Sequence, residues 1–365
     1  MTTGTTGARR YEVAVVGGGQ AGLAIGHLLA KRGLRFVILE AGPAVGSAWH
    51  GRWDSLTLFT SRRYDSLPGL VFPGEAEGYP SRDEVIGYLE QYATRFELPV
   101  RLNSRVDALA HANGTYVLHL GGETIEADQV VVATGPFQTP FVPAVAQSLS
   151  ADVVQMHSTS YRMPSDLPVG TVLVVGGGNT GFQIAAELAA THDVRLSIGS
   201  PQKPLPQRML GRDLFWWLGK TGVLNKTVDS RLGRKLRDRD VLIGSSPRAV
   251  RRLGVKLSPR VTDASGRTIT FADGTTLEPR AVLWATGYKP DYAWIQLPVV
   301  DAAGTLQHRR GVTGHRGLYF LGQQWQHTRG SALLGFVQHD AEYLAERIAG
   351  EAATPTLEES AAAAA

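Results

Sequence analysis

The chain has 365 residues, of which 43% are hydrophobic, which is enough for two domains that each bury a core. It contains no cysteine, and this excludes a disulfide reductase with a redox-active cysteine pair and any zinc or iron–sulfur site built on thiolates. The net charge is +4, no apolar run is long enough to span a membrane, and no signal segment precedes the first strand, so a soluble, cytoplasmic protein is expected.

The first part of the chain has the pattern of a dinucleotide-binding unit. Residues 11–16 predict a buried strand that runs into the turn Gly17-Gly18-Gly19-Gln20-Ala21-Gly22. A helix over residues 23–32 and a strand over residues 35–39 are expected next, and Glu40 ends that strand. A glycine-rich turn with a purely structural purpose is the alternative. The complete order of strand, turn, helix, strand and acid favours a nucleotide site.

The residues of this motif have distinct physical roles. Gly17 permits the tight turn, Gly19 lets the backbone approach a pyrophosphate, and Gly22 lets the helix pack closely on the sheet. The free N–H groups at the helix N-terminus face the phosphates. Glu40 can accept hydrogen bonds from ribose hydroxyls.

A second copy of the pattern begins with a predicted strand over residues 171–175. It runs into Gly176-Gly177-Gly178-Asn179-Thr180-Gly181, a helix over residues 182–190 and a strand over residues 194–198. No acid follows that strand, and the polar residues found there are Ser200, Lys203 and Arg208. Because a carboxylate would repel the 2′-phosphate of NADP and basic side chains attract it, this site is predicted to hold NADPH rather than NADH. Ordinary surface charges on a proline-rich loop are the alternative.

Two further segments connect the predicted sites. Residues 128–135 and 281–287 are each a hydrophobic strand that ends in Ala-Thr-Gly, and each follows a predicted hairpin. We therefore predict an α/β fold with two Rossmann-like dinucleotide-binding domains of three-layer ββα type. The expected limits are residues 10–160 and 281–350 for a discontinuous FAD-binding domain, 161–280 for an inserted NADPH-binding domain, and 1–9 and 351–365 for flexible tails.

The C-terminal part is predicted to return to the first domain. A strand over residues 317–322 precedes a loop and a helix from about residue 331 to residue 348. The N-terminal N–H groups of that helix could stabilise an anionic reduced flavin, or the helix could simply cap the sheet.

Over residues 10–350 the order of motifs resembles that of the flavin-containing monooxygenases. The shared features are both GxGxxG turns, Gly46 with Trp49, both Ala-Thr-Gly strand ends, and a linker of which His157-Ser158-Thr159-Ser160-Tyr161-Arg162 matches the second half. Ala151 and Val153 replace the Phe and Gly of the first half. The resemblance is greatest to short bacterial flavoproteins and to the plant auxin-synthesis branch.

This resemblance implies FAD and NADPH as cofactors, no metal, and two sets of binding residues. For FAD they are Gly17, Gly19, Gln20, Ala21, Gly22, Glu40, Trp49, Val106, Thr134, Gly135, Gly322, Ser331, Ala332 and Leu333. For NADPH they are Tyr161, Arg162, Gly176, Gly178, Asn179, Thr180, Gly181, Ser200, Lys203, Arg208, Ala285, Thr286 and Gly287. The flavin carries the chemistry, so the candidates for a catalytic role are limited to His157, Arg162 and Trp49.

The implied activity is an NADPH- and O₂-dependent oxygenation of a nucleophilic N or S of a small organic substrate through a C4a-hydroperoxyflavin. Many family members carry an Asn in the stretch that matches residues 57–60, and this chain has none there. That difference keeps an NADPH oxidase or diaphorase-type reductase open as an alternative, beside a Baeyer–Villiger monooxygenase and a non-catalytic NADP-sensing module.

Other features allow more than one interpretation. Residues 195–256 hold 15 Lys or Arg against four acids, which fits a nucleic-acid patch, a solvated face or attraction for an anionic dinucleotide, and the neighbouring motif favours the last. Trp216, Trp217 and Trp325 could line a substrate cavity or belong to the core. The expected partners are a small substrate and O₂, without nucleic acid, and a homodimer is compatible with the sequence.

Overall fold

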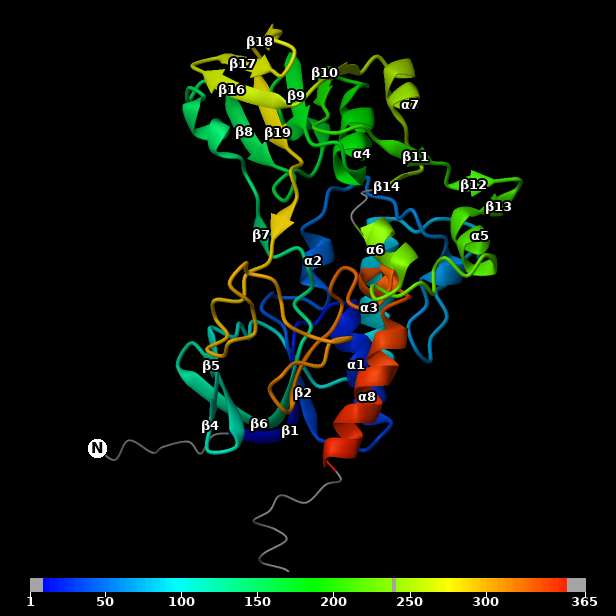
Figure 1. Cartoon of the computed structure of the whole chain (residues 1–365), viewed down its shortest axis with the longest axis vertical. Coiled ribbons are helices and arrows are strands. Elements are labelled where there is room, and N and C mark those ends of the chain that lie inside the picture. Colours follow the sequence, from blue (N-terminus) through cyan, green and yellow to red (C-terminus); the bar gives the residue numbers. More distant parts are fainter. Residues whose placement is uncertain (1–8, 238–240, 353–365) are drawn as a thin grey trace, which may run out of the picture.

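In the computed structural model, which describes residues 9–237 and 241–352, the chain forms two α/β units at opposite ends of an elongated molecule (Figure 1). This confirms the predicted fold class. The α-helices are α1 (Gln20–Ala30), α2 (Ser47–His50), α3 (Arg82–Arg95), α4 (Asn179–Leu188), α5 (Leu214–Lys220), α6 (Arg231–Arg237), α7 (Pro247–Arg252) and α8 (Gln338–Ala352). The 3-10 helices are η1 (Arg62–Tyr64), η2 (Ala144–Ser148), η3 (Pro164–Asp166) and η4 (Arg329–Ala332).

The first unit is built on a seven-stranded sheet. Its strands are β1 (Arg9–Val16), β2 (Phe36–Leu39), β3 (Val100–Arg101), β4 (Ala108–Ala112), β5 (Thr115–Leu120), β6 (Glu123–Val132) and β21 (Leu318–Phe320). The first half of β6 pairs with β5 in the predicted hairpin, and its second half pairs in parallel with β21. Helices α1, α3 and α8 contribute to the core cluster on one face of this sheet.

The second unit is built on a five-stranded parallel sheet in the order β15-β10-β9-β19-β8. These strands are β8 (Val154–His157), β9 (Thr171–Val175), β10 (Asp193–Ser197), β15 (Lys256–Ser258) and β19 (Ala281–Trp284). A separate antiparallel sheet of β16 (Val261–Ser265), β17 (Thr268–Phe271) and β18 (Thr276–Leu277) packs on it through a shared apolar cluster.

The limits of the second unit are wider than those expected from the sequence. Strands β8 and β19 both belong to its sheet, so boundaries at residues 160/161 and 280/281 would cut through it. We therefore propose that the second unit extends from about residue 141 to about residue 287. Most of the two predicted tails lies outside the described residues, although Arg9 is in β1 and residues 351–352 are in α8.

The two connections between the units run side by side. Strand β7 (Thr139–Pro140) leaves the first unit, β20 (Tyr288–Lys289) returns to it, and the two pair in antiparallel fashion (Figure 1). The N–H of Phe141 also donates to the carbonyl of Gly287, at 2.9 Å. A two-stranded ribbon therefore joins the units.

Part of the inserted segment contacts the first unit. It leaves the second unit through β11 (Lys203–Leu205) and returns through β14 (Val241–Ile243), which pair in parallel. Between them lie α5, α6 and the hairpin of β12 (Arg208–Met209) and β13 (Arg212–Asp213). We call residues 206–237 the lobe. The Tyr79 hydroxyl donates to Asp213, at 2.9 Å, and the N–H of Val228 donates to the carbonyl of His327, so the lobe is attached to the first unit at two places.

Candidate functional site

The first glycine-rich turn has the shape that a pyrophosphate requires. Gly17 has φ +114°, and a Cβ there would lie 2.6 Å from the carbonyl oxygen of Ala133 at the end of β6. A Cβ on Gly22 would lie 1.9 Å from the carbonyl oxygen of Gly17. A Cβ on Gly19 would meet nothing within 4 Å. Gly19 is the N-cap of α1, and no side chain of the described residues caps that helix, so its first N–H groups are left available to a phosphate.

Two polar side chains beside this turn fit the rest of an FAD molecule. Glu40 accepts the N–H of Gly18 at 2.7 Å and that of Gly42 at 2.8 Å, which holds its carboxylate beside the turn. Gln323 follows Gly322 at the end of β21, and its buried Nε2 has no hydrogen-bond partner among the described residues. A buried amide N–H group without a partner is costly, and a bound hydroxyl would satisfy it. The residues present therefore fit FAD, and Gln323 was not predicted from the sequence.

The second turn repeats this geometry. Gly176 has φ +135°, and a Cβ there would lie 2.1 Å from the carbonyl oxygen of Ala285, in the second Ala-Thr-Gly. A Cβ on Gly181 would lie 2.0 Å from the carbonyl oxygen of Gly176. Gly178 is the N-cap of α4, again without a capping side chain. Each turn therefore lies against the end of a strand that returns to its own sheet.

The basic residue that lies beside the end of β10 is Arg260. Its Nη2 donates to the carbonyl of Gly199 at 3.1 Å, next to Ser200. Lys203 is exposed on β11. Arg208 lies elsewhere, since its guanidinium donates to the carbonyl of Glu77 and stacks 5.7 Å from the Tyr79 ring. The structure thus brings Arg260 and Ser200 together and holds Arg208 against the first unit.

Two other residues predicted for NADPH have partners within the protein. The Tyr161 ring is buried and its hydroxyl donates to Glu187 of α4 at 2.8 Å. Burial raises the pKa of this phenol, and the nearby Glu187 raises it further. The Asn179 side chain donates to the carbonyl of Val241 at 3.2 Å and accepts the N–H of Ile243 at 2.9 Å. These side chains fix α4 and β14 in place.

His157 lies at the ribbon between the units. Its Nε2 is 3.1 Å from the carbonyl of Gly287, so Nε2 carries the proton and Nδ1 accepts the N–H of Thr159 at 3.2 Å. Burial lowers the pKa of His157, which keeps the ring neutral. The ring also meets that of Tyr288 edge-on at 5.3 Å. This arrangement suits a positioning role.

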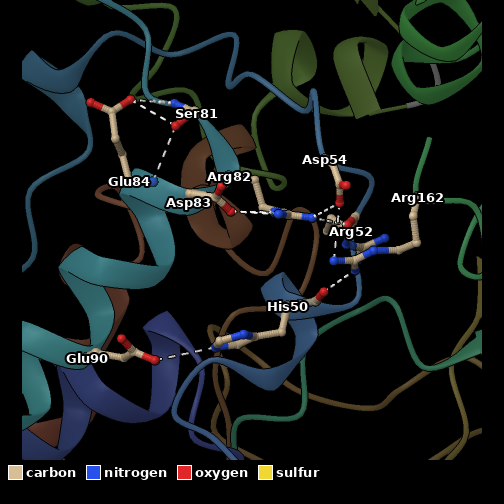
Figure 2. A network of polar contacts seen from close by, with 9 residues as sticks. All are labelled: His50, Arg52, Asp54, Ser81, Arg82, Asp83, Glu84, Glu90 and Arg162. Atoms are coloured by element: carbon tan, nitrogen blue, oxygen red, sulfur yellow. Dashed lines mark hydrogen bonds and ion pairs between the residues drawn. The ribbon is translucent and has the colours of Figure 1, made fainter. Parts of the chain in front are cut away.

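Arg162 belongs to a polar network that joins the linker to the first unit. Figure 2 shows its guanidinium between the carbonyl of His50, to which it donates, and Asp54 at 3.3 Å. Arg82 of α3 donates to the same carboxylate. Nearby, Arg52 donates to the Tyr288 hydroxyl at 2.6 Å. Arg162 therefore ties the two units together next to the segment that carries Trp49.

The remaining residues predicted for FAD surround the first turn or lie on the C-terminal loop. Trp49 Nε1 donates to the side chain of Gln20 at 3.1 Å. Gln138 donates to the Thr134 hydroxyl and to the carbonyl of Gly135. The Cβ of Ala21 would lie 2.9 Å from a Cβ placed on Gly322. Val106 is buried in a second core cluster of the first unit. The last group is Ser331, Ala332 and Leu333, in and just after η4.

The predicted helix from residue 331 to residue 348 is wrong at its start. Helix α8 begins at Gln338, after the short helix η4 and a run of turns. Gly335 explains the delay, because a Cβ there would lie 2.1 Å from the carbonyl oxygen of Tyr64. The loop thus packs closely on the segment that carries Tyr64, and this close packing of the backbone favours a loop over a continuous helix. η4 is capped instead, since the Thr328 hydroxyl accepts the N–H of Gly330 at 3.2 Å.

A buried carboxyl group lies beside this loop. Asp65 is fully buried, Thr60 donates to its Oδ1 at 2.6 Å, and its Oδ2 has no partner among the described residues. Burial, with a smaller contribution from the neighbouring Asp213, raises the pKa of Asp65 to about 7. Asp213 is buried as well, which raises its pKa. No sequence pattern indicated this pair, because the two residues are distant in the chain.

A cavity of about 280 Å³ lies where the lobe, α4 and the first unit meet. Its apolar wall includes Trp53, Phe59 and Phe182, and its polar groups include the Gln183 and Gln207 amides. Among the residues that the structure describes, no charged side chain lines it, and Trp216, Trp217 and Trp325 do not line it either. In the described part of the chain no helix is long and apolar enough to cross a membrane, and no three His, Asp or Glu residues are grouped as a metal site would require.

Comparison with known proteins agrees with this geometry. The profile of the pyridine nucleotide-disulphide oxidoreductase family matches residues 14–208. The uncharacterized oxidoreductase CzcO-like of Geobacillus kaustophilus is 44% identical over 91% of this chain and 97% of its own length. The rice indole-3-pyruvate monooxygenase YUCCA1 is 28% identical over 84% of this chain and 85% of its own. The flavin-containing monooxygenase of Stenotrophomonas maltophilia superposes with a TM-score of 0.79, at 28% identity, over 94% of this chain and 100% of the other.

Proposed function

We propose that this chain, which belongs to the pyridine nucleotide-disulphide oxidoreductase family and within it to the flavin monooxygenase-like oxidoreductases, is an NADPH-dependent monooxygenase. Its expected substrate is a small organic molecule with a nucleophilic N or S atom. The single observation that carries the proposal is the pair of glycine turns, each lying against an Ala-Thr-Gly strand end. The chain has no cysteine, so the disulfide chemistry in the family description does not apply to it.

The family uses FAD and NADP(H), and we assign FAD to the first turn and NADPH to the second. When bound, FAD would supply the redox chemistry, which uses two electrons from NADPH and one O₂ to give one oxygen atom to the substrate and the other to water. The N-termini of α1 and α4 direct free N–H groups at the two pyrophosphates. Glu40 binds ribose hydroxyls, and Gln323 donates to a hydroxyl of the flavin side chain.

The choice of NADPH is assigned to Ser200 and Arg260. The Arg260 guanidinium is held beside Ser200 by the carbonyl of Gly199, where a 2′-phosphate would follow the ribose at the end of β10. Lys203 is close in sequence and adds positive charge. His157 and Arg162 position the linker against the first unit and move no proton in this scheme.

The substrate is assigned to the cavity beside Trp53. Because its wall has no charge, an uncharged thioether or amine would enter without leaving a buried charge unpaired. Its volume of about 280 Å³ gives room for a small organic substrate. We place the reaction in the cytoplasm, where NADPH is supplied.

Product analysis under ¹⁸O₂ tests this function. The purified holoprotein would be given NADPH and a panel of thioethers, amines, hydroxylamines and ketones, and both products and H₂O₂ would be quantified. The proposal expects ¹⁸O in a sulfoxide or an N-oxygenated product. Recovery of all consumed O₂ as H₂O₂ for every substrate would support an NADPH oxidase instead, the alternative suggested by the absence of Asn in residues 57–60. Labelled esters from the ketones would identify a Baeyer–Villiger enzyme.

A further inference from the structure

The tip of the lobe exposes apolar side chains to solvent. Leu210, in the turn between β12 and β13, is 84% exposed, and the adjacent Met209 is 42% exposed. Leu232 on α6 is a further exposed apolar residue, at 41%. The hairpin stands at the outer edge of the molecule, away from both large sheets (Figure 1). A leucine this exposed loses the stabilisation that burial would give it.

The same turn is also strained. Leu210 has φ +51°, a left-handed conformation that costs free energy for a residue with a Cβ, and Gly211 follows at φ +75°. Two-residue turns of this kind favour Asn-Gly at these positions, because Asn tolerates positive φ. Leucine is therefore a poor choice for the turn and a poor choice for an exposed surface. The two costs together point to a partner for the side chain.

The charge around the tip indicates what that partner is. Residues 206–237 include eight basic residues, all exposed: Arg208, Arg212, Lys220, Lys226, Arg231, Arg234, Lys235 and Arg237. Only two acids lie in the same segment, and one of them, Asp213, is buried. Of the basic residues, Arg212 and Lys220 lie by the hairpin, on the ring of Trp216, whereas α6 with its bases stands apart from it, beside the first unit (Figure 1). An exposed apolar tip with cationic side chains beside it matches a bilayer surface, where acyl chains lie beneath anionic headgroups.

Tryptophan supports the same partner. Trp216 lies between two cations, with Arg212 at 5.6 Å and Lys220 at 5.8 Å from its ring, and it is half-buried at the base of the hairpin. Trp is enriched at membrane interfaces because its ring is apolar and its N–H is polar. We propose that the hairpin end of the lobe is a peripheral docking site for an anionic phospholipid bilayer, with Leu210 and Met209 inserted and Arg212 and Lys220 on the headgroups.

Vesicle flotation of the full-length holoprotein tests this. We expect binding to vesicles of phosphatidylcholine mixed with phosphatidylglycerol, little binding to phosphatidylcholine alone, and loss of binding at high salt. Leu210→Asn should reduce the partition coefficient by roughly ten-fold, since the inserted side chain is lost. It also places Asn-Gly in the turn, so the fold should be retained. Val71→Asn removes another exposed side chain, 79% exposed and in the first unit, and should leave binding unchanged.

Several outcomes would overturn the proposal. These are absence of flotation with anionic vesicles at low salt, equal binding by native protein and Leu210→Asn, and equal binding to neutral and anionic vesicles. If the native protein instead forms a dimer that Leu210→Asn dissociates, without any vesicle binding, the tip is an interface with a second copy of the chain and the bilayer assignment is wrong. A charge variant, Lys220→Gln, separates the electrostatic part, because it should weaken binding at low salt and leave the turn intact.

Discussion

Asp65→Asn should stabilise the protein at neutral pH and remove a decline in stability between about pH 4 and pH 7. The folded pKa of Asp65 is raised to about 7 from 3.8. Below pH 4 the carboxyl is protonated in both the folded and the unfolded chain. As the pH rises, the unfolded chain releases its proton first, so the free energy of unfolding falls until the folded group also ionises near pH 7.

The size of the effect follows from the width of that window. Each pH unit in it is worth about 1.4 kcal/mol, so the full decline is at most about 4 kcal/mol. Asn resembles the protonated acid and its Oδ1 can still accept the hydroxyl of Thr60, so the variant lacks this decline. The difference in unfolding free energy between variant and native protein should therefore grow by about 2–3 kcal/mol from pH 5 to pH 8.

Urea denaturation at fixed excess FAD, followed by tryptophan fluorescence at several pH values, measures this difference. Asp128→Asn is the control, since that carboxylate is exposed and its pair with Arg10 contributes at most about 1 kcal/mol. A constant difference between Asp65→Asn and native protein from pH 5 to pH 8 would refute the reasoning, because it would mean that the buried carboxyl does not change its charge in that range.

Three further predictions test the sites and the core. Gly19→Ala should keep the fold and weaken FAD binding at least about ten-fold, whereas Gly22→Ala should lower the yield of folded protein, because its Cβ would collide with the backbone. Flavin content measures the first effect and circular dichroism the second. Equal behaviour of the two variants would contradict the turn geometry. Arg260→Gln should raise KM for NADPH about ten- to a hundred-fold and leave KM for NADH unchanged. The control is Arg267→Gln, which removes an arginine that is paired with Asp152. If the preference for NADPH were unchanged in Arg260→Gln, this residue would not belong to the site. Asp340→Asn removes the charge from a largely buried ion pair with Arg310 and should lower the free energy of unfolding by about 2 kcal/mol, which lowers Tm by several degrees. An unchanged Tm would show that this ion pair does not contribute to stability.

Local patterns in the sequence predict most of the two nucleotide folds. The strand over residues 171–175 was predicted at its observed limits, and helix α4 begins three residues before its predicted start, because the motif Gly-x-Gly-x-x-Gly continues into the first helical turn. Both hairpins were also found from their glycine turns. Such elements are specified by periodicity and turn residues that lie next to one another in the chain.

The features that were missed depend on contacts between distant segments. Arg260 reaches Gly199 because β15, which Arg260 follows, pairs in parallel with β10. The signal for it in the sequence is a basic residue just after the strand that neighbours β10 in the sheet. Of the two basic residues that follow Ser200, Lys203 and Arg208, the second is held by Glu77 and Tyr79 of the first unit. The membership of strand β8 in the second sheet could not be predicted either, because β8 lacks a nucleotide motif of its own and joins that sheet only through β19.

The position of β21 in the chain has a consequence for biosynthesis. The second half of β6 pairs with β21, which leaves the ribosome only after the whole second unit has been made. During that interval β6 has an unpaired edge, and the α1 surface that will contact α8 is uncovered. The second unit has all five strands of its sheet before β21 appears, so it can fold while the first unit is still incomplete. A chain truncated just before β21 should therefore have a native second unit and an aggregation-prone first unit. We expect chaperones to bind such a chain, which would not be a smaller stable protein.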